Sequence, residues 1–169
     1  MKIRCRKHST QGSALVEAGI VLPLLVALML NVANFGMYIY AWVTVNNAAR
    51  ALLEYRVYTG VVLGYPPSAS TTQMRDLVTT EVSSLPNKTS IKWVVCGPKH
   101  TDGTLDCVGT GTPFAPDADP ADSAHYVLYS AKVSYTFQSL FPPVTLPVGY
   151  SVAGLPGSVS RQISMRSMQ

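Results

Sequence analysis

Charged side chains are few in this sequence, and their distribution predicts no basic surface. Only 13% of the residues are charged, whereas 47% are hydrophobic. Beyond residue 12, nine cations balance nine acids, so the formal net charge of +4 equals that of four earlier cations, Lys2, Arg4, Arg6 and Lys7. Proteins that bind nucleic acid neutralise phosphates with a basic patch. The body of the chain lacks that excess, which excludes nucleic acid as its partner.

The motifs of common catalytic sites are also missing. The sequence has no G-x-S-x-G elbow, no H-E-x-x-H and no phosphate-binding loop. After residue 12 the only histidines are His100 and His125, and neither stands in a pattern with a nucleophile. An enzyme is therefore the weakest hypothesis, and no cofactor is expected.

Two sets of side chains suggest a metal only weakly. Cys96, His100 and Cys107 lack the paired short spacing of structural zinc sites, and a fourth ligand is not evident. The acidic stretch Asp117 to Asp122 is interrupted by proline and lacks the glycine and distal glutamate of a calcium-binding EF-hand loop. We expect a solvated loop there and no metal site.

What the sequence does contain is one long uncharged run. No charged residue lies between Glu17 and Arg50, and the stretch from Ala18 to Leu30 has no polar residue. Since about 20 apolar helical residues cross a bilayer, the run predicts a transmembrane helix. Pro23 is expected to bend it, which membrane helices tolerate.

The flanks of the run predict its orientation. The basic cluster precedes it, so residues 1 to 12 are expected in the cytoplasm and the chain after about Tyr40 outside. Tyr38, Tyr40 and Trp42 cluster at the far end, as aromatic side chains do at a membrane interface. An ordinary secretory signal peptide also begins with basic residues, but its apolar run is shorter and its cleavage site is nearer the N-terminus.

The junction before the apolar run reads GSALVE, from Gly12 to Glu17. With the small residues and arginine of 46–51 and the following Tyr55, it resembles the TadE-like family of pilin-like proteins of the tight-adherence (Flp) pilus. The resemblance implies a type III signal peptide that a prepilin peptidase cuts after Gly12, so that Ser13 becomes the first residue. It also implies two further partners, namely other pilin and pseudopilin subunits and an inner-membrane assembly platform.

Glu17 has two possible roles. A carboxylate one helical turn after Ser13 lies on the same face as the new α-amino group, and pairing with the amine of the same or a neighbouring subunit would neutralise it and set subunit register. Alternatively, Glu17 extends into the lipid headgroups at the membrane edge.

Helical spacing extends past the membrane. Ala48, Ala51, Leu52 and Tyr55 recur on one face, so the helix is expected to continue as a stem to residue 58, with its charged residues, including Arg56, in water. A second helix is predicted from Ser70 and Gln73, which form a capping-box pattern, and from an apolar stripe. The stripe comprises Met74, Leu77, Val78, Val82 and Leu85.

Alternating apolar residues predict three strands, at 90–95, 127–137 and 159–165. The expected fold class is therefore α+β: a long N-terminal transmembrane and stem helix, a second helix and a small antiparallel sheet, as in pilins. The expected divisions are a cytoplasmic leader (1–12), the helix (13–58) and an exported domain (59–169).

Segments 97–124 and 138–157 are rich in Gly, Pro, Asp and Thr and are expected to be long loops. In an exported domain, Cys96 and Cys107 are the plausible disulfide.

These features favour a minor pilin, or pseudopilin, that sits in the bacterial inner membrane and joins a tight-adherence pilus. The alternative is a single-pass anchor that is never processed and whose exported domain binds a ligand or an envelope partner.

Overall fold

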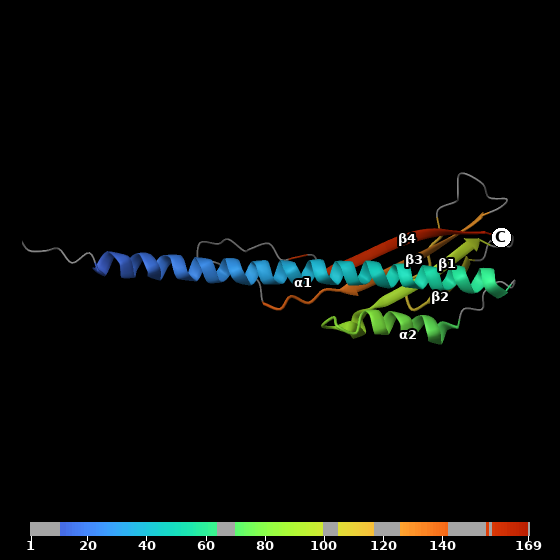
Figure 1. Cartoon of the computed structure of the whole chain (residues 1–169), viewed down its shortest axis with the longest axis horizontal. Coiled ribbons are helices and arrows are strands. Elements are labelled where there is room, and N and C mark those ends of the chain that lie inside the picture. The colour runs from blue at the N-terminus through green and yellow to red at the C-terminus, as the bar shows by residue number, and fades with distance from the viewer. Residues whose placement is uncertain are drawn as a thin grey trace, which may run out of the picture.

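The computed structural model describes residues 11–63, 70–99, 105–116, 126–141, 155 and 157–168. One helix, α1 (Gln11–Leu63), runs the length of the molecule, and a four-stranded sheet and helix α2 (Thr71–Glu81) pack along its C-terminal half (Figure 1). We call α1 from Ala41 onward, α2 and the sheet the sheet domain. The expected α+β architecture is confirmed. Residues 1–10 of the leader, His100, His125 and the acidic stretch lie outside the described residues.

Helix α1 is continuous over 53 residues. It passes through Pro23, whose missing N–H leaves the carbonyl of Gly19 without its usual helical donor. It also passes Gly60 and ends at Leu63, five residues beyond the predicted end of the stem. Membrane and stem segments are therefore one rod, about 80 Å long at 1.5 Å per residue.

Helix α2 presents the predicted apolar stripe to the core. Met74 and Val78 are buried, as are Val82 and Leu85 just after the helix. The predicted capping box is wrong: Ser70 is the N-cap residue but makes no side-chain capping hydrogen bond. Gln73 instead accepts a hydrogen bond from the Tyr55 hydroxyl, which ties α2 to α1.

The sheet has the order β2-β1-β3-β4, with every neighbouring pair antiparallel. The strands are β1 (Lys92–Lys99), β2 (Leu105–Gly109), β3 (Tyr126–Thr136) and β4 (Ser158–Met168), and a short 3₁₀ helix, η1 (Lys88–Ser90), precedes β1. Strands β1, β3 and β4 were predicted. The prediction of a loop throughout 97–124 is wrong at 97–99, where β1 continues, and at β2, which pairs with β1 as a hairpin.

Strand register places one apolar face of the sheet against the helices. Trp93 lies opposite Val133, and Ala131 lies between Val95 and Ile163 on the neighbouring strands. Against this face α1 presents small and branched side chains at helical spacing, namely Ala41, Val45, Ala48, Ala49, Leu52 and Leu53, all buried. The opposite sheet face is mostly polar, with the hydroxyls of Ser130 and Ser164 paired at 2.6 Å.

Candidate functional site

The N-terminal half of α1 is an exposed apolar helix. Large side chains such as Leu15, Ile20 and Met29 are exposed by 75%, 70% and 69%. Within the described residues one helix is long and apolar enough to cross a membrane, and none of its most apolar window is buried within the protein. A core helix would be covered by its own domain, so this half of α1 fits a single-pass membrane anchor.

The junction residues open this helix. Gly12 and Ser13 lie in the first turn of α1, and Glu17 follows Ser13 by four residues. Backbone geometry therefore places Ser13 and Glu17 on the same helical face. The Glu17 side chain is exposed, which leaves it accessible to an amine or to headgroups.

Aromatic side chains of α1 join the helix to the sheet domain where the helix enters it, namely Tyr38, Tyr40 and Trp42. Tyr38 makes an edge-to-face contact with Phe137, with ring centroids 5.3 Å apart. The hydroxyl of Tyr40 bonds the hydroxyl of Ser84 at 2.7 Å. Their position matches the predicted membrane exit, and they also hold the domain to the helix.

Arg161 of β4 reinforces this junction. Its guanidinium carbon lies 4.0 Å from the centroid of the Trp42 ring, a cation–π contact. Trp42 is on α1, so the contact fixes the sheet at the same level as the two tyrosines. The sheet domain is thus held to α1 by these contacts near Trp42 as well as by the apolar core.

Asn34 makes a further contact with the connection after β3. Its side-chain nitrogen donates to the carbonyl of Phe141, and its side-chain oxygen accepts from the Phe141 N–H, both at 3.2 Å. Among the described residues, Asn31, one turn earlier, bonds to the carbonyl of Ala27 within the helix. Asn34 therefore ties residues 107 positions apart in the chain.

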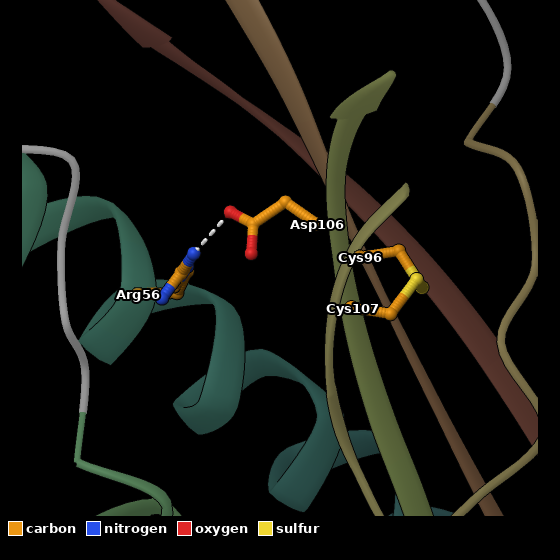
Figure 2. A network of polar contacts seen from close by, with 4 residues as sticks. All are labelled: Arg56, Cys96, Asp106 and Cys107. Atoms are coloured by element: carbon orange, nitrogen blue, oxygen red, sulfur yellow. Dashed lines mark hydrogen bonds and ion pairs between the residues drawn. A yellow bond between two sulfur atoms is a disulfide. The ribbon is translucent and has the colours of Figure 1, made fainter. Parts of the chain in front are cut away.

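At the far end of the sheet domain, Arg56 forms a buried ion pair with Asp106 of β2, with Nη2 and Oδ2 2.6 Å apart (Figure 2). The arginine side chain is 5% exposed, so the expectation that Arg56 faces water is wrong. Its guanidinium also lies 5.6 Å from the centroid of the Tyr129 ring. Gly97 leaves room for that ring, because a Cβ there would come within 2.8 Å of it.

Burial raises the pKa of Tyr129; Arg56 lowers that pKa and Asp106 raises it, and the net shift is upward. Burial also raises the pKa of Tyr135, whose hydroxyl donates to the carbonyl of Pro86. Both phenols therefore favour the neutral form and act as fixed hydrogen-bonding or packing groups near neutral pH.

The structure contains a disulfide between Cys96 and Cys107, which are directly paired across β1 and β2 (Figure 2). Because both thiols are used, the zinc alternative loses two of its three ligands. Among the described residues no group of histidine, cysteine and carboxylate side chains could hold a metal ion. The disulfide closes the hairpin that also carries Asp106.

A shallow groove lies between α2, η1 and the start of β1. Its floor is the buried Trp93, Val78 and Val82, and its rim includes Arg75 and Lys88. The described residues that line it include no histidine, carboxylate or cysteine.

Residues 12–52 match the family model described as TadE-like protein. The match confirms the resemblance expected from the sequence, over the segment that carries it. It begins at Gly12 and ends at Leu52, so it covers the exposed half of α1 and the first turns packed on the sheet. Comparison with the curated proteins and with the solved structures gave no match.

Three contacts described above were not predicted from the sequence: Arg56 with Asp106, Arg161 with Trp42, and Asn34 with Phe141. Asn34 carried a usable signal, because a side-chain amide in an uncharged apolar run needs a hydrogen-bonding partner. The two arginines carried none, since each partner comes from a distant element.

Proposed function

We propose that this chain is a minor pilin, or pseudopilin, of a tight-adherence (Flp) pilus, and that it contributes to pilus assembly or initiation and so to surface adhesion. The family match over residues 12–52 carries the proposal. The same residues form the exposed apolar half of α1. In this function α1 anchors the subunit before assembly and contacts other pilin subunits and the inner-membrane platform during it.

The proposed location is the bacterial inner membrane. The basic residues before α1 favour a cytoplasmic N-terminus, so the sheet domain lies in the periplasm before any incorporation into the pilus. The disulfide between Cys96 and Cys107 supports this side, because disulfides persist in oxidising compartments. The stretch 1–12 is then a leader that stays in the cytoplasm.

Processing after Gly12 is consistent with the local helix. The bond between Gly12 and Ser13 lies in the first turn of α1, where backbone N–H groups have no helical partners. Glycine costs an α-helix about 1 kcal/mol relative to alanine, so this turn opens at low cost. A prepilin peptidase can then bind the bond in an extended conformation.

The direct test is the N-terminal sequence and mass of the protein recovered from membranes with and without the matching prepilin peptidase. We expect a chain that starts at Ser13 when the peptidase is present and an uncut chain when it is absent. Gly12→Leu should abolish cleavage, because a branched side chain obstructs the close approach of the protease to the backbone.

Gly19→Ala is the matched control, since a Cβ at Gly19 meets nothing within 4 Å. It should be cleaved like the original chain. An uncut chain in both strains would rule out processing and leave the alternative function, an anchor whose exported domain binds a ligand or an envelope partner.

We further propose that Glu17 pairs with the α-amino group of Ser13 after cleavage, in its own or a neighbouring subunit, and so sets the register between subunits. The four-residue spacing on α1 supports this pairing. A carboxylate within the bilayer requires such a counter-charge, because its insertion costs on the order of 3 kcal/mol at mid-span.

Glu17→Gln should leave cleavage intact and reduce co-purification with other pilin subunits at least tenfold, because the amide lacks the charge that neutralises the amine. Glu54→Gln, an exposed carboxylate on the packed part of α1, is the control and should co-purify normally. Normal co-purification of Glu17→Gln would show that Glu17 only reaches the headgroups.

A further inference from the structure

The position of Asn34 along α1 sets its depth in a membrane. If the hydrocarbon-spanning segment starts at Ala14, about 20 residues at 1.5 Å each bring its outer boundary to Ala33. If it starts at Ala18, after the carboxylate of Glu17, the boundary falls at Met37. Asn34 lies within one helical turn of the outer boundary in both cases.

The pairing of Asn34 with Phe141 suits that depth. The side-chain amide bonds both the N–H and the carbonyl of Phe141, at 3.2 Å each, so each group satisfies the other without water. Polar groups at the edge of hydrocarbon need such internal partners. The pairing therefore places the backbone of residue 141 at the outer boundary.

Leu140 and Phe141 are apolar, and the polar Ser139 just before them turns its hydroxyl to the Phe141 carbonyl. Leu140, next to Phe141, is 51% exposed and carries no polar group. No charged residue occurs between Lys132 and Arg161 in the sequence. Leucine and phenylalanine are the side chains that bury favourably at the boundary between headgroups and acyl chains.

We propose that Leu140 and Phe141, a few residues after β3, form a second membrane contact, in which Leu140 enters the outer leaflet and Asn34 holds it there. The molecules that contact the exposed side chain of Leu140 are membrane lipids. The inference rests on the membrane anchoring in the proposed function and is independent of cleavage after Gly12. With this contact, the end of the sheet domain near Leu140 touches the bilayer surface.

The test uses the full chain, with Cys5→Ser and the disulfide intact, reconstituted in phosphatidylcholine–phosphatidylglycerol vesicles. A nitrobenzoxadiazole (NBD) fluorophore is attached to a cysteine at one of three positions, Leu140, Leu25 or Thr79, and quenching by lipids spin-labelled near the headgroup or deep in the chain is measured. At Leu140 we expect a blue-shifted emission and quenching at least threefold stronger by the shallow label.

Leu25 and Thr79 are the controls. Leu25 lies in the exposed apolar half of α1 and should be quenched by the deep label, whereas Thr79 is exposed on α2 and should be quenched by neither. Absent quenching at Leu140, with normal quenching at Leu25, would overturn the inference and leave the anchor intact. Absent quenching at both would instead refute the anchor.

Two further outcomes are decisive. A blue shift at Leu140 without quenching by either lipid would mean that a second copy covers it, which contradicts a lipid contact. Asn34→Ala removes the pairing with Phe141 and should reduce quenching at Leu140 at least twofold. Unchanged quenching would refute the holding role of Asn34.

Discussion

Replacing Gly109 by alanine is expected to destabilise the sheet domain by roughly 3–5 kcal/mol. Gly109 has φ +145°, a conformation that L side chains rarely adopt. A Cβ there would lie 2.2 Å from the carbonyl oxygen of Trp93 and 2.7 Å from Cα of Val94. Both are backbone atoms, so β1 would have to move.

The cost is large because the same carbonyl holds the end of the hairpin. The Trp93 oxygen accepts from the N–H groups of Thr110 and Gly111 at 2.7 and 2.8 Å. Urea unfolding of the full chain in detergent micelles, followed by tryptophan fluorescence, measures the loss. A second measurement is the fraction of Cys96 and Cys107 that remains as free thiol, which should rise when the hairpin is displaced.

Gly157→Ala is the matched control. Gly157 directly precedes β4, and a Cβ there meets nothing within 4 Å. Its free energy of unfolding should change by less than about 0.5 kcal/mol. If both substitutions lowered the free energy of unfolding equally, the loss would come from replacing any glycine. It would then not come from the backbone conformation of Gly109 or its approach to Trp93.

Replacing Arg56 by methionine is expected to cost about 2–3 kcal/mol. Methionine retains most of the volume but loses the charge, so Asp106 no longer has its partner at 2.6 Å and Tyr129 loses the guanidinium. Asp106 is 34% exposed and keeps some hydration, which places the loss below the roughly 3–5 kcal/mol of a fully buried pair. The same urea experiment measures it.

Arg50→Met provides the comparison, because Arg50 is an exposed arginine on the same helix. It should change the free energy of unfolding by less than about 0.5 kcal/mol. A double-mutant cycle with Asp106→Asn should give a coupling of about 1 kcal/mol or more. Strict additivity of Arg56→Met and Asp106→Asn would mean that the ion pair does not stabilise the protein.

The sequence predicted those parts of the fold that follow from apolar residues repeating at helical or strand spacing over a short stretch of chain. The apolar run of α1, the stripe of α2 from Met74 to Leu85, and the alternation of β3 each follow from residues near one another in the chain. The junction at Gly12 and Glu17 is local too, and so is the resemblance that the family match confirms. Cleavage at Gly12 and the role of Glu17 stay predictions.

What sequence could not predict depends on distant partners. Strand β2 is short, and Asp106 and Gly109 interrupt its apolar pattern, so its pairing became evident only opposite β1. Arg56 lies 50 residues before Asp106, and a charged residue on a stem helix is ordinarily solvated. Gln73 fits a capping box locally, but Tyr55 competes for it from another helix.

If the chain is anchored as proposed, the exposed half of α1 restricts how it can leave the bilayer. Most large apolar side chains from Leu15 to Val32 are exposed, and wetting them all would cost on the order of tens of kcal/mol. In the proposed function, the helix would therefore pass directly from the acyl chains to other apolar helices, because transfer through water costs too much free energy. Helix α1 is unbroken up to Leu63, and the sheet packs on its C-terminal half. A displacement of α1 along its axis would therefore move the sheet by the same distance.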